Sequence, residues 1–71
     1  MIEYVIAYST AVPGIALNQA IVSEQDVRLA ASLHARLSLR GVVYVYEHRP
    51  KRRNLRGPMV AAVTPNGWFP T

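Results

Sequence analysis

The sequence contains no cysteine and only two histidines. The lack of cysteine excludes disulfide bonds, and so few histidines beside it exclude a structural zinc site of the Cys/His kind. A chain of 71 residues forms one domain, and such a small domain buries only about 60% of the surface that its unfolded form exposes. Apolar burial therefore has to stabilise the fold, either within the chain or across an interface with a partner subunit.

Long apolar runs are lacking as well. No run reaches the length of a transmembrane helix, and residues 1–8 lack the basic leader and the uniform apolar core of a secretory signal. Slightly more than half of the residues are apolar and the net charge is +4, a combination typical of a globular chain rather than a disordered one. We expect a soluble, cytoplasmic protein.

Motifs of catalysis are absent too. The sequence has no cysteine nucleophile, no G-x-S-x-G, no H-E-x-x-H and no P-loop. The segment 12–15 has one glycine, too few for a loop that cradles phosphate. No two of the four acids have an assured common location. We therefore predict a protein that is not an enzyme and has no metal and no cofactor. The four acids are Glu3, Glu24, Asp26 and Glu47.

Acidic residues are missing from one particular stretch, residues 48–58, which holds five of the eight basic residues. Outside this stretch, three arginines stand against four acids, so the rest of the chain is close to neutral. Such a local concentration of positive charge favours a polyanionic or acidic partner. Arginine donates to phosphate through a planar fork, so we expect these side chains to bind nucleic acid. The five residues, here named the basic arm, are Arg49, Lys51, Arg52, Arg53 and Arg56.

The segment that carries the basic arm is longer than the two to five residues or so of an ordinary hairpin loop. Pro50 and Pro58 bracket the charges and oppose strand pairing, because proline has no amide hydrogen. We expect an exposed arm over residues 51–57. Two alternatives stay open: an acidic protein surface as the partner, or a solvated turn whose charges keep a sheet edge from aggregating.

Three aromatic side chains lead directly into the basic arm. Tyr44, Tyr46 and His48 alternate along one predicted strand, so stacking on nucleic-acid bases could accompany the phosphate contacts. The other interpretation is that they are ordinary strand residues. His34 lies within the apolar arc of the predicted helix, where we expect a satisfied core or interface histidine rather than a catalyst.

The hydrophobic periodicity predicts one helix and several short strands. Period-two alternation indicates a strand over residues 2–8, and residues 15–22 favour a second strand over a helical turn. Ser23 is a good N-cap for a helix over residues 24–39, with Gly41 suited to a left-handed cap. The apolar arc of this helix comprises Val27, Ala30, Ala31, Leu33 and Leu37.

The second half of the chain predicts strands over residues 42–47 and 59–63, followed by a turn at 64–67 and a short return strand at 68–69. This order predicts an α+β fold: a small mixed or antiparallel β-sheet of three to five strands with one helix packed on one face. One helix leaves the second face uncovered, and an uncovered apolar face usually marks an interface. A homodimer is therefore an open alternative. The aromatics that could occupy this face are Tyr4 and Tyr8, or Tyr44 and Tyr46, with Trp68 or Phe69.

The layout from Ser23 to Trp68 resembles that of small phage or prophage accessory proteins, including some anti-CRISPR inhibitors. It comprises the capped helix, the V-V-Y-V-Y-E strand, the connector, a short apolar strand and N-G-W. This resemblance implies non-enzymatic binding to a host complex or to nucleic acid, with no catalytic residue to carry over. The strand, helix, strand, strand order also resembles the flavin-binding dodecins, but no residue here matches their ligand-contacting motifs, so no flavin site is transferred.

We thus expect a small binding protein that engages a polyanion, most simply nucleic acid, through the basic arm. The alternative is a protein-protein interaction or inhibitor module that docks through an apolar, aromatic sheet face. Salt separates the two, because phosphate contacts are screened and apolar contacts are not.

Overall fold

The computed structural model describes residues 2–8, 18–38, 40–51 and 56–71, with the backbone alone at residue 18. These residues form an α+β fold in which one helix packs on a five-stranded sheet. The predicted fold class is therefore confirmed. In chain order the elements are β1 (Glu3–Tyr8), β2 (Asn18–Ser23), α1 (Val27–Leu37), β3 (Val43–His48), β4 (Arg56–Thr64) and β5 (Gly67–Pro70).

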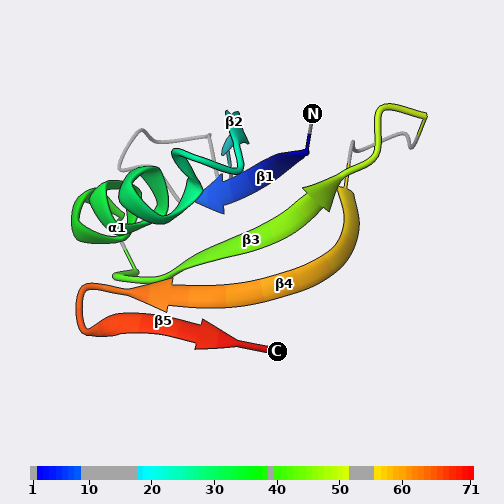
Figure 1. Ribbon diagram of the computed structural model, residues 1–71. Coiled ribbons are helices and arrows are strands. Elements are labelled where there is room, and N and C mark those ends of the chain that lie inside the picture. Colours follow the sequence, from blue (N-terminus) through cyan, green and yellow to red (C-terminus); the bar gives the residue numbers. More distant parts are fainter. Residues whose placement is uncertain (1, 9–17, 39, 52–55) are drawn as a thin grey trace.

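The sheet has the strand order β2-β1-β3-β4-β5, and every neighbouring pair is antiparallel. The strands β1 and β3, which are separated in the sequence by β2 and α1, therefore lie side by side in the sheet, and α1 lies against one side of the sheet (Figure 1). Ile6 pairs with Val45, and Val43 pairs with Val63. The apolar segments of the sequence thus meet in the middle of the sheet, which places the core there.

The core lies between α1 and one face of the sheet. Because side chains alternate along a strand, Ile6, Val43 and Val45 point to the same face, and all three are fully buried. From the helix, Ala31 and Ala35 meet them and are also fully buried. Alanine has a short side chain, so it lets the helix backbone approach the sheet closely, and the core is thin.

The helix begins later than the sequence predicts. Residues up to Ser23 stay extended in β2, and the amide of Glu24 still donates to the carbonyl of Ile2 at 3.1 Å. The N-cap is therefore Asp26 rather than Ser23, whose hydroxyl donates to the carboxylate of Asp26 at 3.1 Å. Ser23 therefore pairs with β1 as the last residue of β2 and does not cap the helix. No helix within the described part of the chain is long and apolar enough to cross a membrane.

The apolar arc predicted for the helix is only partly buried. Val27 and Ala31 face the core, as expected, but Leu33 and Leu37 are 50% and 82% exposed. The helix has two apolar sides, one of alanine and valine and one of leucine, and sequence periodicity merges them into one broad arc. The sheet takes the side with the smaller residues, so the prediction for Leu33 and Leu37 is wrong.

Strand β4 begins at Arg56, three residues before the predicted start at Met59, and it includes Pro58. The pairing with β3 shifts register on both sides of Tyr46, which marks irregularities of the β-bulge type. A bulge tolerates proline because the ladder is interrupted there, so Pro58 does not end the pairing. The connector between β3 and β4 is correspondingly shorter than expected, and β4 curves strongly along its length (Figure 1).

Two turns after the helix use glycine as the sequence predicts. Gly41 has a φ of 70°, in the left-handed region, but α1 already ends at Leu37 with Ser38 as its C-cap, so this glycine serves the turn into β3 rather than the helix cap. Gly67 has a φ of 150° and pairs with Thr64 at the start of the β4–β5 hairpin. Neither position suits a side chain, since a positive φ strains any residue with a Cβ atom.

Candidate functional site

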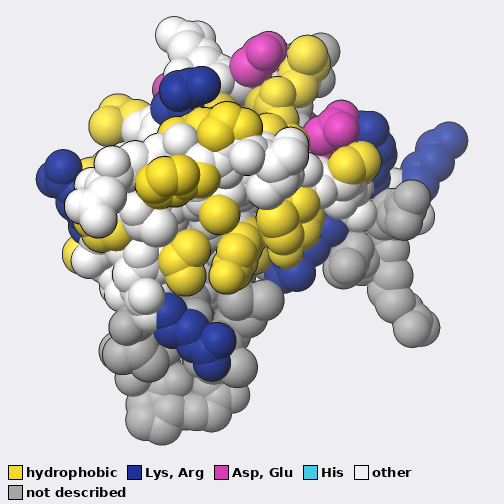
Figure 2. Space-filling view, turned by 90° about the horizontal axis from the view of Figure 1, so that it is seen from below, with side chains coloured by type: hydrophobic (Ala, Val, Ile, Leu, Met, Phe, Trp, Pro, Cys, Tyr) yellow, Lys and Arg dark blue, Asp and Glu magenta, His cyan; other side chains and the backbone are white. Residues whose placement is uncertain are grey.

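The sheet face opposite α1, here named the open face, carries three of the six aromatic residues. Tyr44 is 39% exposed and Phe69 is 54% exposed. Both pair with Ala62, which lies on the strand between them, so the three form one row across β3, β4 and β5. Seen from below, at the sheet edge that β5 forms, hydrophobic side chains gather at the centre of the view with Lys and Arg side chains around them (Figure 2).

Tyr46 lies on the same face as Tyr44, two residues further along β3. It pairs with Val5 of β1, and Tyr44 pairs with Ala7. Val5 and Ala7 are 0% and 1% exposed, although no described helix covers this face. The open face is therefore not a flat apolar sheet: its small residues are buried beside two tyrosine rings, and the rings form its surface.

Arg56 lies across the open face and connects strands that are far apart in the sequence. Its guanidinium carbon is 5.0 Å from the centre of the Tyr46 ring, and its Nε donates to the side-chain oxygen of Gln19. Gln19 is on β2, so the contact spans from β4 over β3 and β1 to the far edge of the sheet. Val5 pairs with Tyr46 on one side and with Ile21 on the other, so it lies between strands that this contact connects. Arg56 thus has a structural role within the site.

Arg49 contacts a different part of the molecule. Its Nη2 atom lies 2.9 Å from Oε1 of Glu47, in an ion pair between side chains that are 48% and 38% exposed. Glu47 shares its strand face with Val43 and Val45, which is the face that α1 covers. Gly57 permits this arrangement, because a Cβ atom there would lie 2.7 Å from Cγ of Arg49. Arg49 and Arg56 are therefore held on opposite faces of the sheet.

Of the three remaining cations of the basic arm, the structure describes Lys51. Lys51 is exposed, just after β3 ends. Arg52 and Arg53 lie outside the described residues, as does most of the segment predicted to be an exposed arm. The described part of that segment shows one exposed cation, Lys51, and one cation that is part of β4, Arg56.

The two histidines both contact neighbouring side chains. Nδ1 of His48 is 3.5 Å from Oε1 of Glu3, and the His48 side chain is only 13% exposed. His48 is therefore poorly placed to stack on a base, unlike Tyr44. His34 stacks on the ring of Tyr8, with centroids 4.3 Å apart and planes 17° apart, an arrangement in keeping with the predicted packing role.

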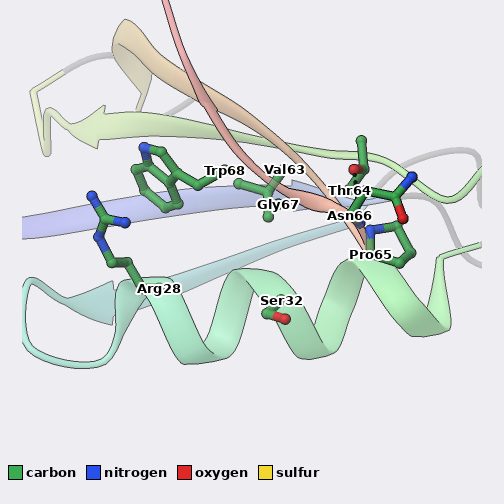
Figure 3. A pocket seen from close by; sticks show the side chains of 8 residues that line it. All are labelled: Arg28, Ser32, Val63, Thr64, Pro65, Asn66, Gly67 and Trp68. Atoms are coloured by element: carbon green, nitrogen blue, oxygen red, sulfur yellow. Dashed lines mark hydrogen bonds between the residues drawn. The ribbon is translucent and has the colours of Figure 1, made fainter.

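Trp68 lies on the other side of the sheet from Tyr44 and Tyr46. It packs against the core beneath α1, and the guanidinium carbon of Arg28 lies 4.6 Å from its ring centre. Arg28 and Trp68 point toward one another at one end of a hollow of about 210 Å³ between α1 and the β4–β5 turn (Figure 3). A second hollow of about 420 Å³ also adjoins Trp68, beside the start of the helix. The predicted stacking residues thus separate into two groups.

Two residues of the open face were not identified by the sequence as site residues. Gln19 has no motif around it, and only the pairing of β2 with β1 brings it within reach of Arg56. Phe69 was considered only as an alternative to Trp68. Alternation along β5 supplied the missing signal, because Trp68 pairs with the buried Val63 and Phe69 must then face the other way.

The acids and histidines do not form a metal-binding group. Among the residues that the structure describes, no three histidine or acidic side chains come together in a way that could hold a metal ion. The contacts of Glu3 with His48 and of Glu47 with Arg49 lie on different faces. The described chemistry of the site is therefore that of aromatic rings and cations.

Comparison with known proteins identifies no relative of this chain. No protein-family model matches it, and neither a curated protein nor a solved structure matches it. The resemblance to small phage proteins, drawn from the layout of the sequence, gains no support from these comparisons. The function is argued below from the geometry of the site.

Proposed function

We propose that this protein binds single-stranded nucleic acid on the open face, without catalysing a reaction. Tyr44 and Phe69 stack on bases, and the cations of the basic arm contact phosphates. The observation that carries the proposal is that Arg56 extends over the same sheet face that exposes the two aromatic rings. Aromatic rings on an open sheet with cations at its margin are the usual means of holding unpaired bases.

The spacing of the aromatic row supports this function. Tyr44 and Phe69 are separated by one strand, which places them about 10 Å apart, since neighbouring strands lie about 4.8 Å from each other. Ala62 lies between them, and its short side chain leaves room for a base to rest against either ring. Tyr46 is held by Arg56 and continues the aromatic surface toward the basic arm.

The arrangement of the cations favours a backbone contact that is independent of sequence. Lys51 is exposed just after the end of β3, and the sequence adds Arg52 and Arg53 directly after it. A single strand is flexible enough for its bases to lie on the rings while its phosphates follow these charges. Binding should therefore be tolerant of sequence and sensitive to salt.

The test is the affinity for labelled single-stranded DNA and RNA of mixed sequence, measured by fluorescence anisotropy at several salt concentrations. Tyr44→Ala and Phe69→Ala should each weaken binding roughly 5- to 150-fold, because one stacked base contributes about 1–3 kcal/mol. The matched control is Leu29→Ala, which truncates a side chain that is 68% exposed on the helix and should leave the affinity unchanged. Wild-type protein that binds neither nucleic acid at low salt would refute the proposal.

The same experiment tests the contribution of charge with a matched pair of variants. Lys51→Ala should lower the slope of log affinity against log salt by about 0.7, the value for one phosphate contact on a single strand. Arg36→Ala removes an equal charge from the exposed side of α1 and should leave that slope unchanged. Equal effects of the two variants would show that net charge, rather than the basic arm, attracts the nucleic acid.

A second candidate function is docking of a partner protein on the open face. The observation that favours it is apolar exposure at that face, where Ile21 and Met59 are 46% and 40% exposed in addition to the aromatic row. Apolar association should survive about 0.5 M salt, which screens charges beyond a few ångströms. Loss of a binding partner on Ile21→Ser, at high salt and without nucleic acid, supports this function over the first.

A further inference from the structure

The hollow of about 210 Å³ between α1 and the β4–β5 turn lies on the opposite side of the sheet from the open face. Arg28 and Ser32 line it from the helix, and Val63, Pro65 and Trp68 contribute apolar walls from β4, the turn and β5. Arg28 and Trp68 lie at one end and Pro65 at the other (Figure 3). The proposed function makes no use of this hollow, here named the Arg28 hollow.

Arg28 has no acidic partner in the described part of the chain. All four acidic residues lie in that part, and the ion pairs formed there join other side chains. Glu24 precedes Arg28 by four residues, a spacing that pairs opposite charges within a helix. The helix begins only at Val27, however, so this pair does not form. The positive charge of Arg28 therefore lacks a counter-charge at the hollow that it lines.

The ring of Trp68 holds the guanidinium group of Arg28 in place. The guanidinium carbon lies 4.6 Å from the centre of the ring, and a contact of this kind uses the flat face of the guanidinium group. Its N–H groups lie around the edge of the plane, so they remain able to donate. One arginine can give a carboxylate two parallel hydrogen bonds. Trp68 thus positions a donor group that suits a carboxylate.

Ser32 supplies a second donor. It lies one helical turn after Arg28, about 6 Å further along the helix axis, and it lines the same hollow. Its hydroxyl has no hydrogen-bond partner among the described residues. Because no buried polar side-chain atom in that part of the chain is unpaired, this hydroxyl is open to solvent. The helix therefore presents one charged and one neutral donor opposite the apolar wall of Val63 and Pro65.

We propose that the Arg28 hollow binds a monocarboxylate with a small apolar body, whose carboxylate accepts from Arg28 and whose body contacts Val63 and Trp68. Charge complementarity selects the carboxylate, because Arg28 is the single cation and no acid stands among the described residues that line the hollow. A phosphate group carries nearly two charges at neutral pH, so one arginine beside apolar walls matches it less well. The volume selects a small ligand, since pockets for drug-sized ligands measure about 300–1,000 Å³.

The neighbouring hollow of about 420 Å³ suits this ligand less well. It shares Arg28 and Trp68 with the Arg28 hollow, but Glu24 also lines it, and the charge of Glu24 repels a carboxylate. The carboxylate site is also independent of the proposed function, because the nucleic acid would lie on the open face, beyond the sheet. Both can hold at once, and neither result decides the other.

The experiment is a titration of the full, nitrogen-15-labelled chain with sodium benzoate at constant ionic strength, followed by two-dimensional NMR. The indole N–H of Trp68 and the amide of Gly67 should shift together, with a dissociation constant of about 1 mM, the range expected for so small a ligand. The amide of Val60, which adjoins only the second hollow, should stay in place. Benzamide has the same shape without the charge and should bind at least about tenfold more weakly.

Variants assign the binding to the helix donors. Arg28→Gln removes the charge and should weaken benzoate binding at least about tenfold. The matched control is Arg36→Gln, which removes an equal charge from the exposed side of α1 and should leave the affinity unchanged. Arg28→Lys keeps the charge without the planar fork, so its affinity should lie between the two. Ser32→Ala should weaken binding roughly 2- to 10-fold. The spectrum of each variant shows directly whether it is folded.

The carboxylate can belong to a free acid or to the end of a peptide, and an acetylated tripeptide with a free carboxyl end separates these sources. Tighter binding of benzoate supports the free acid, and tighter binding of the tripeptide supports the chain end. Three results would overturn the proposal: no shift at about 30 mM benzoate, equal binding of benzoate and benzamide, or unchanged affinity in Arg28→Gln. Inorganic phosphate that binds more tightly than benzoate would overturn the choice of a carboxylate.

Discussion

Replacement of Arg56 by alanine should destabilise the fold, although Arg56 belongs to the basic arm that the sequence assigns to nucleic acid. The variant loses the contact with the Tyr46 ring at 5.0 Å, which contributes about 0.5–1 kcal/mol at an exposed position. It also loses the hydrogen bond to Gln19, worth about 0.5–1.5 kcal/mol. We expect the free energy of unfolding to fall by about 2 kcal/mol, and the melting temperature by roughly 8–16 °C in a domain of this size.

Urea denaturation followed by circular dichroism measures this loss, and a double-mutant cycle assigns it. Gln19→Ala alone should lower the free energy of unfolding by about 1 kcal/mol. Once Arg56 is alanine, removing Gln19 as well should change little, so the coupling energy between the two residues should be about 1 kcal/mol. Arg56→Lys keeps the charge but loses the planar stacking group, and its stability should lie between those of the wild type and Arg56→Ala.

Lys51→Ala is the control for the loss of positive charge. Lys51 is exposed, so its removal should change the free energy of unfolding by less than about 0.5 kcal/mol. If Arg56→Ala is no less stable than Lys51→Ala, the bridge from β4 to β2 makes no contribution and the structural role given to Arg56 is wrong. A coupling energy near zero with a large loss in Arg56→Ala would assign the stability to contacts of Arg56 other than the hydrogen bond to Gln19.

Three further changes test the packing. Ala31→Leu forces a larger side chain between α1 and the sheet at a fully buried position, so it should lower the free energy of unfolding by about 1–3 kcal/mol in urea denaturation; an unchanged midpoint would contradict the close approach of the helix. Gly67→Ala strains a turn with a φ of 150° and should lower the melting temperature by several degrees, an effect that Asn66→Ala should not reproduce. Arg28→Ala removes the cation 4.6 Å from the ring of Trp68, so the emission of this single tryptophan should change, whereas Arg36→Ala should leave it unaltered.

Much of the fold could be predicted from local patterns. The β-branched and aromatic run at residues 42–47 has few other ways to be stable, and it became β3. The Thr64 to Gly67 turn was predicted because Asn-Gly accepts positive φ, and Gly67 adopts it. These features depend on neighbours in the sequence, so the sequence alone specifies them. The boundaries of the strands were predicted less accurately, because strand pairing extends β2 to Ser23 and β4 back to Arg56.

The candidate site could be predicted only in part. The sequence identified Tyr44 and Tyr46 and the charges that follow them, but it placed Trp68 with them and gave all five basic residues one role. Alternation in β5 sends Trp68 to the helix side, and pairing in β4 commits Arg56 to Tyr46 and Gln19. Gln19 and Arg56 are 37 positions apart, so no pattern of near neighbours could reveal their contact.

By itself the sequence determined the composition of this protein's surfaces: a basic arm without acids, a helix with one broad apolar arc and strands rich in tyrosine and valine. Only the tertiary structure decided which surface each residue joins. Ala31 and Ala35 took the place against the sheet that Leu33 could have filled, because a thin core between one helix and a short-stranded sheet admits the smaller side chains. The leucines and the open aromatic face were thereby left to the solvent. Which apolar side is buried depends on the shape of the opposing surface, and that shape exists only once the strands have paired.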